Sequence, residues 1–200
     1  METTKKKPTA DEALALLMAG NARFISGNLE HPNHCEESRK LLAGGQEPIA
    51  VVLACADSRV PPVNLFDLGL GDLFICRVAG NIINDHILGS IEYAVEHLHT
   101  PLVMVMAHSC CGAVTAVSSG DRIGGHVASL IPSIETAIKQ VKAGGCKENL
   151  VDQASRQVAR NAAKLIAISE PIIADKVISG DVKVVAAFYD FHDGKVTILD

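Results

Sequence analysis

Two short clusters in this chain of 200 residues contain side chains that bind metal ions. Residues 55–59 read CADSR, and residues 108–112 read HSCCG. Thiolates and an imidazole form a good donor set for zinc, which has four protein ligands in structural sites and three in catalytic sites. With three suitable groups in two clusters, the sequence predicts a zinc site whose fourth position is open or exchangeable.

The ligands that we assign are Cys55, His108 and Cys111. His108 and Cys111 are three residues apart, a spacing that places both side chains on one face at the start of a helix. Cys110 would point about 200° around such a helix from His108, so we expect it to be a small hydrophobic core residue. No two cysteines of the chain have the Cys-x-x-Cys spacing of a thiol-redox motif.

Asp57 and Arg59 lie beside the first thiolate, and two interpretations apply to them. An exposed Asp-x-Arg is ordinarily a surface ion pair that contributes little to stability. Next to a metal ligand, Arg59 can instead hold Asp57 ionised through charge pairing and a forked hydrogen bond. Asp57 could then accept a hydrogen bond from metal-bound water, or move in and ligate the metal itself.

The composition excludes several classes of protein. The net charge of −5, the absence of Trp and the 4% content of aromatic residues argue against a nucleic-acid-binding protein. No uncharged apolar run approaches the roughly 18 residues of a membrane span. The apolar stretch after residues 5–7 (KKK) is short and follows two acidic residues, unlike a signal peptide. We therefore expect a soluble, cytoplasmic protein.

The chain first forms an arm, residues 1–45, which we expect to be helical in two pieces separated at 27–33. Thr9 and Glu12 have the spacing of a capping box, and Gly20 supplies a C-terminal stop. The remainder, residues 46–200, is predicted to be an α/β core, and the whole chain to be one domain.

Strand-like and helix-like segments alternate in this core. Parallel strands buried on both faces read as continuous apolar runs, and crossover helices separate them. We expect a central, mostly parallel sheet with helices on both faces and an antiparallel edge strand that follows the hairpin signal at 192–194. The predicted strands are 49–54, 73–78, 102–107, 182–189 and 195–199, and the predicted helices are 86–98, about 130–141, about 151–168 and a short one after Pro171.

The two clusters fall at the ends of strands in this scheme. Cys55 follows the strand at 49–54, and His108 follows the strand at 102–107. In open α/β sheets ligands bind at the carboxyl ends of the strands. The topology therefore places both clusters at one edge of the sheet.

Cys-x-Asp-Ser-Arg followed about fifty residues later by His-x-x-Cys-Gly is similar to the signature of the β-class carbonic anhydrases. Further stretches of the chain resemble the bacterial branch of that family. They read GNARF at 20–24, VPP at 60–62, GDLF at 71–74, RVAGN at 77–81 and YDFHDG at 189–194. The resemblance covers nearly the whole chain.

The resemblance implies a homodimer or tetramer that hydrates CO₂ reversibly to bicarbonate and a proton, by attack of zinc-bound hydroxide. Cys55, His108 and Cys111 would be the ligands of one zinc ion per subunit. Asp57 and Arg59 would form the adjoining catalytic dyad, with Asp57 on the metal only in a closed form. Gly69 stands where plant-type members have a Gln.

Two other functions remain open at this point. The same zinc site could hydrolyse CS₂ or COS, and a non-catalytic zinc protein could use the metal only to hold its fold. Cys35, Cys76 and Cys146 have no assigned role. Cys76 lies in a predicted strand and should be buried, whereas Cys35 and Cys146 lie in polar segments.

Overall fold

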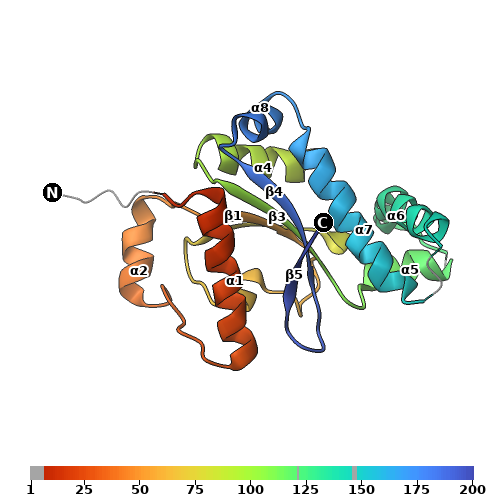
Figure 1. The fold of residues 1–200 in the computed structure, drawn as a ribbon, viewed down its shortest axis with the longest axis horizontal. Helices are drawn as coiled ribbons and strands as arrows, with labels where there is room; N and C mark the ends of the chain where they lie inside the picture. Colours follow the sequence, from red (N-terminus) through yellow and green to blue (C-terminus); the bar gives the residue numbers. More distant parts are fainter. Residues whose placement is uncertain (1–6, 121, 146–147) are drawn as a thin grey trace.

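The computed structural model describes residues 7–120, 122–145 and 148–200, and its centre is a five-stranded sheet (Figure 1). The strand order is β2-β1-β3-β4-β5, with parallel pairing everywhere except between β4 and β5, which pair antiparallel. The mostly parallel sheet with an antiparallel edge is thereby confirmed. The strands are β1 (Ala50–Ala54), β2 (Leu73–Arg77), β3 (Leu102–His108), β4 (Lys183–Tyr189) and β5 (Val196–Leu199).

Two interior strands, β1 and β3, explain why the sequence predicts the sheet so clearly. Every residue of β1 and of β3 is buried, because helices cover both faces of the sheet. Their continuous apolar runs follow directly from this two-sided burial. β2 lies at one edge, and only Leu73 and Cys76 of its residues are buried.

Helices form a layer on each face of the sheet (Figure 1). The first layer, α4, α7 and α8, packs on one face, while α1 and α3 pack on the other. α5 and α6 lie beside α7, beyond the end of the sheet that carries the two clusters. The helices are α1 (Ala10–Ser26), α2 (Glu36–Leu41), α3 (Pro62–Leu65), α4 (Asp85–Glu96), α5 (Gly112–Ser119), α6 (Ile131–Ala143), α7 (Leu150–Ala167) and α8 (Ile172–Ser179), with 3₁₀ turns η1 (Leu42–Gly44), η2 (Ala79–Asn81) and η3 (Gly125–Leu130).

The arm begins as predicted, but its first helix is longer. The capping box of Thr9 and Glu12 is present, and α1 runs past Gly20 to end at Gly27, whose φ is 72°. The predicted stop at Gly20 is wrong. A Cβ at Gly20 would lie 1.8 Å from the carbonyl oxygen of Phe66, so this glycine allows the helix to approach α3 closely.

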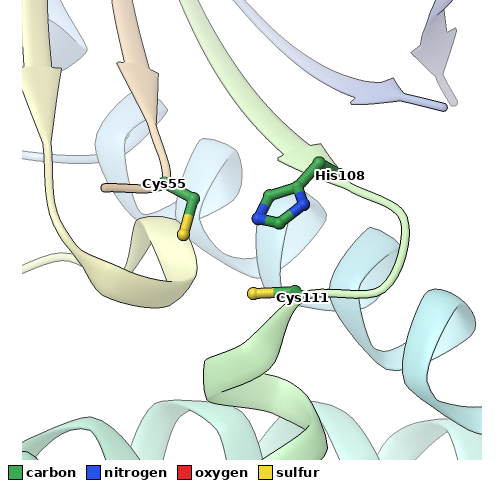
Figure 2. Close-up of side chains that lie close together, drawn as sticks. All are labelled: Cys55, His108 and Cys111. Atoms are coloured by element: carbon green, nitrogen blue, oxygen red, sulfur yellow. The ribbon is translucent and has the colours of Figure 1, made fainter. Parts of the chain in front are cut away.

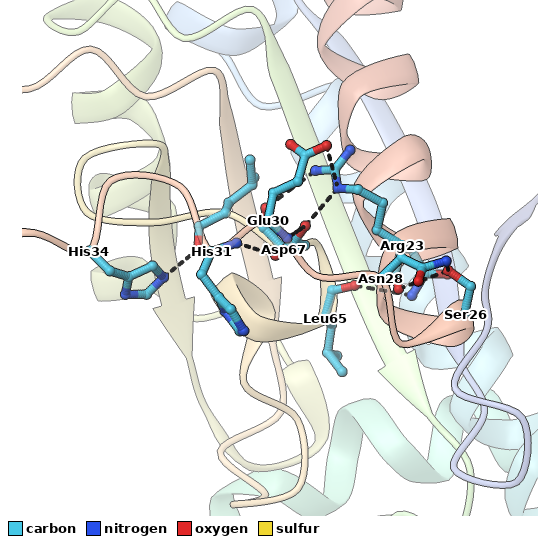
Figure 3. Close-up of polar contacts among 10 residues, drawn as sticks. Arg23, Ser26, Asn28, Glu30, His31, His34, Leu65 and Asp67 are labelled. Carbon is cyan, nitrogen blue, oxygen red and sulfur yellow. Dashed lines mark hydrogen bonds and ion pairs between the residues drawn. The ribbon is translucent and has the colours of Figure 1, made fainter.

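A buried carboxylate ties the arm to the core (Figure 3). Asp67, in the loop between α3 and β2, accepts a hydrogen bond from Arg23 Nε at 2.6 Å and from the backbone N–H groups of Glu30 and His31, each at 3.0 Å. Burial alone would raise the pKa of Asp67, but these hydrogen bonds lower it to about 2. One ionised side chain of the core therefore binds three N–H groups of the arm.

No helix in the described ranges is both long enough and apolar enough to cross a membrane.

Candidate metal centre

The sheet brings the two clusters together at the carboxyl ends of neighbouring strands. Cys55 directly follows β1, His108 ends β3, and β1 pairs with β3. Cys111 lies where the chain turns back after β3. The sulfur atoms of Cys55 and Cys111 and a ring nitrogen of His108 all lie within 4.8 Å of one another, and all three residues are buried (Figure 2). The predicted grouping of these three residues is confirmed.

The route from His108 to Cys111 differs from the predicted helical spacing. His108 is still part of β3, and Cys111 is the N-cap residue that precedes α5. Between them the chain makes a tight turn, with Cys110 in the left-handed region at φ 52°. This turn, and not a shared helix face, points both side chains at Cys55.

The expectation that Cys110 is a core residue is wrong. The residue is exposed, because the left-handed turn directs it away from the cluster. Its backbone N–H donates to Asp152 Oδ1 of α7 at 2.9 Å. No sequence signal links Asp152 to the turn, since the two residues are 42 positions apart.

A second contact fixes the same turn to the β4–β5 hairpin. The N–H of Ser109 donates to the carbonyl oxygen of Tyr189, and the hydroxyl of Ser109 accepts from the N–H of Phe191, both at 2.9 Å. Ser109 is buried. The turn that joins His108 to Cys111 is therefore held by α7 on one side and by the β4–β5 hairpin on the other.

The donor atoms are prepared for a cation. His108 Nδ1 donates to the carbonyl oxygen of Ser109 at 2.9 Å, which leaves Nε2 with its lone pair. That Nε2 is buried, and no atom of the described residues is hydrogen-bonded to it. A buried nitrogen without a partner is costly in a folded protein. A metal ion held jointly with the two sulfur atoms would satisfy it.

The pKa values of the Cys55 and Cys111 thiols are shifted in opposite directions. The pKa of Cys55 is lowered, chiefly by a hydrogen bond from the Cys111 thiol, then by the neighbouring His108 ring, and also by the Gly80 N–H, 3.3 Å from its sulfur. The pKa of Cys111 is raised, because its proton is held by Cys55 and because burial disfavours a second negative charge. Binding both as thiolates requires a compensating cation, and a zinc ion supplies it.

The sequence assigns no role to the three remaining cysteines, and the structure describes two of them. Cys76 is buried as predicted, and burial raises the pKa of its thiol to about 11. Cys35 is exposed, as its polar surroundings suggest. Cys146 lies outside the described residues.

Asp57 and Arg59 form a local clamp beside the cluster. Asp57 Oδ1 accepts from the backbone N–H and from Nε of Arg59, at 2.9 and 3.0 Å, and Oδ2 accepts from Nη2 at 2.8 Å. These hydrogen bonds lower the pKa of Asp57 to about 2, against a smaller effect of burial. The side chain of Asp57 is 17% exposed and that of Arg59 is 56% exposed. The pair is thus ionised and open to solvent.

Arg77 is a further residue of the site that the sequence analysis missed. From the end of β2 it donates through Nε to the carbonyl oxygen of Cys55 at 2.9 Å, and through Nη2 to the carbonyl oxygen of Asp57. Arg77 pairs in register with Ala54, the last residue of β1. It therefore satisfies the carbonyl groups of the first cluster after the strand ladder has ended.

Known proteins resemble this chain over most of its length. A sequence model of the carbonic anhydrase family matches residues 50–196. The chain is 35% identical to carbonic anhydrase 2 of Mycobacterium tuberculosis over 188 residues, which cover 92% of this chain and 90% of the relative. It is 37% identical to a carbonic anhydrase of Mycolicibacterium smegmatis over 186 residues, which cover 91% and 89% of the two chains.

Solved structures agree on the fold. A tetrameric β-carbonic anhydrase of Sordaria macrospora superimposes with a TM-score of 0.75 at 23% identity, over 93% of this chain and 96% of the other. A Coccomyxa β-carbonic anhydrase in complex with acetazolamide superimposes with a TM-score of 0.72 at 25% identity, over 80% and 75% of the two chains.

Proposed function

This chain belongs to the β-carbonic anhydrase family, and from that premise we propose that its buried Cys-His-Cys centre serves the reversible hydration of CO₂ to bicarbonate and a proton. The observation that carries the proposal is that two sulfur atoms and a ring nitrogen of His108 lie within 4.8 Å of one another, buried at the carboxyl ends of β1 and β3, while Nε2 of His108 has no hydrogen-bond partner among the described residues.

Cys55, His108 and Cys111 would hold the metal. Zinc bound there would lower the pKa of a water molecule, so that hydroxide is available near neutral pH to attack the carbon of CO₂. The chain's own contribution is to hold the three donors rigidly. The strand ends fix Cys55 and His108, while Asp152 and the β4–β5 hairpin fix the turn that carries Cys111.

Asp57 is proposed to accept a hydrogen bond from the reacting water. A carboxylate offers about four lone-pair sites, and Arg59 fills three of them in this structure. One site on Oδ2 stays available. Because its pKa is about 2, Asp57 is ionised throughout the neutral range and accepts a hydrogen bond without taking up the proton.

The closed form, in which Asp57 itself occupies the fourth metal position, stays a prediction. It requires the carboxylate to leave Arg59, with which it makes three hydrogen bonds in this structure. Determining the metal shell at low and high pH tests it. An Asp57 that stays on Arg59 at both pH values would reject the closed form.

The two other functions considered from the sequence are not favoured. The relatives that match at high coverage are carbonic anhydrases, and none of those described above is a CS₂ or COS hydrolase. A purely structural metal site gives no reason for the Asp57–Arg59 clamp beside it.

The assembly is proposed to be a homodimer or tetramer, and the location cytoplasmic. A tetrameric relative of the same fold supports the oligomer, and the bacterial origin of the two mycobacterial relatives is compatible with the location. We also propose that residues 1–45 and 46–200 form one domain, which the Arg23–Asp67 contact between them supports.

The test is stopped-flow CO₂ hydration by the purified protein, with zinc measured per subunit and with Cys55→Ser as the matched variant. We expect one zinc per subunit and fast hydration for the wild type. Removing a ligand should cost more than the 10–100-fold loss typical of residues behind the ligands. A zinc-loaded wild type that does not accelerate hydration contradicts the proposal.

A further inference from the structure

We propose that Phe191 is a positioning residue for the proposed reaction: its ring holds the guanidinium of Arg59 where it can clamp Asp57. This inference rests on the proposed function only for its kinetic consequence. The contact itself belongs to this chain whether or not it hydrates CO₂.

Phe191 joins the two clusters through its ring. The Arg59 guanidinium carbon lies over the ring at 4.3 Å from its centroid, and the His108 ring centroid lies 5.1 Å away. Arg59 belongs to the first cluster and His108 to the second. The ring therefore contacts one side chain from each.

The ring is itself well fixed. The backbone N–H of Phe191 donates to the buried hydroxyl of Ser109, in the turn between His108 and Cys111. The ring also meets Tyr189 edge-on, with centroids 5.4 Å apart. The metal-binding turn therefore fixes the position of Phe191, and the ring of Phe191 in turn supports Arg59.

Arg59 needs such a support. Its side chain is 56% exposed, and an exposed ion pair alone holds two side chains weakly. A guanidinium stacked on an aromatic ring gains a further attraction that, at exposed sites, corresponds to about a two- to fivefold change in population. The stack and the fork to Asp57 restrain the same group from two directions.

The spectroscopic test follows the Arg59 Nε–H and Cδ protons by NMR in the zinc-loaded protein. In the wild type the ring current of Phe191 should shift them away from the values of an unstacked arginine. Phe191→Leu should remove this shift, and Phe191→Tyr, which keeps the ring, should retain it. A shift that survives in Phe191→Leu overturns the inference.

A second arginine–phenylalanine stack, whose ring belongs to β4, serves as a matched control. Arg156 stacks on Phe188, 3.5 Å from the ring centroid, in the core on the opposite face of the sheet. Phe188→Leu should move the Arg156 signals, leave those of Arg59 in place and lower the melting temperature. It should leave kcat per bound zinc unchanged, because that ring supports no part of the clamp.

The kinetic test separates positioning from mere stabilisation. Phe191→Leu should lower kcat per bound zinc about two- to fivefold with KM for CO₂ little changed, and Phe191→Tyr should restore it. If kcat per zinc in Phe191→Leu equals that of an active wild type, Phe191 does not position Arg59 for the reaction. If the wild type is inactive but the resonances move as expected, the stack stands and the proposed function alone fails.

Discussion

Asp57 and Asp67 lie ten residues apart and show the same chemistry in two different settings. Each is paired with an arginine, and each has a pKa of about 2. The Asp67 side chain is fully buried and its partner Arg23 is 28% exposed, whereas the corresponding values for Asp57 and Arg59 are 17% and 56%. An equal pKa therefore does not indicate an equal role.

The difference lies in what each carboxylate connects. Asp67 accepts from α1 and from the loop after it, so it joins segments that are 36 to 44 residues away in the chain. Among the described residues, the Asp57 carboxylate accepts only from Arg59, two residues away, and keeps one acceptor site for another molecule. We therefore propose that the buried pair contributes to stability, and that the exposed pair serves the proposed reaction.

The largest effect is expected from Asp57→Asn on activity. Loss of one hydrogen-bonding partner of the transition state typically lowers kcat 10²–10³-fold, and we expect kcat for CO₂ hydration to fall by at least about 100-fold. Zinc content should be unchanged, and the free energy of unfolding should fall by about 1 kcal/mol, less than for Asp67→Asn, because Arg59 is 56% exposed and solvent screens the pair. Full activity in this variant would remove the distinction between the two pairs.

Asp67→Asn should lower the stability of the protein and leave its activity nearly unchanged. The left-handed backbone at this position, φ 46°, is one that asparagine adopts readily, so the change removes the charge and one accepting oxygen without straining the backbone. Breaking a buried ion pair costs about 3–5 kcal/mol. Because Arg23 is partly exposed, we expect about 2–3 kcal/mol in urea denaturation, with kcat per bound zinc little changed. A loss of activity without a loss of stability would reverse the assignment.

Acid should weaken the buried pair in a defined range of pH. The pKa of Asp67 is about 2 in the folded chain and about 3.9 in an unfolded one. Its contribution, about 2.6 kcal/mol, is therefore fully present above pH 5 and is lost as the pH falls through 4 towards 2.

The measurement is the difference in unfolding free energy between the wild type and Asp67→Asn, followed from pH 6 to pH 3. Other acid-sensitive groups, including the metal ligands, cancel in this difference. The gap between the two proteins should narrow towards low pH. A constant gap would show that packing, and not the charge of Asp67, holds the arm.

The smallest change in unfolding free energy is expected for an exposed ion pair, which serves as the reference for the other two pairs. Glu135 and Lys139 form an exposed pair one turn apart on α6, 3.3 Å between charged atoms. Glu135→Gln should change the unfolding free energy by about 0.5 kcal/mol or less. A change as large as that of Asp67→Asn would mean that burial does not separate strong from weak pairs in this protein.

The sequence predicts the sheet and the metal donors because both leave local patterns. The runs of β1 and β3 are apolar throughout, since both faces are covered, and Cys55 and His108 end or directly follow those strands. Strand order then brings the two residues together. The hairpin before β5 was also predicted correctly, from its turn residues.

The sequence does not predict contacts that depend on three-dimensional packing. Gly20 resembles a helix stop, yet it is the point where α1 meets the backbone of Phe66. The outward position of Cys110 depends on a left-handed turn and on Asp152, 42 residues away. The supports come from Arg77 at the end of β2 and from Phe191 in the turn between β4 and β5, and they leave no pattern near the clusters.

The most direct test of the account is the zinc X-ray absorption spectrum of the purified wild-type protein. Cys55, His108 and Cys111 as ligands predict two sulfur neighbours at about 2.3 Å and one nitrogen neighbour at about 2.0–2.1 Å, with one further light-atom ligand. Cys55→Ser should reduce the sulfur count to one, or abolish binding. A wild-type spectrum with no sulfur neighbours, or with four, would contradict the assignment of this centre.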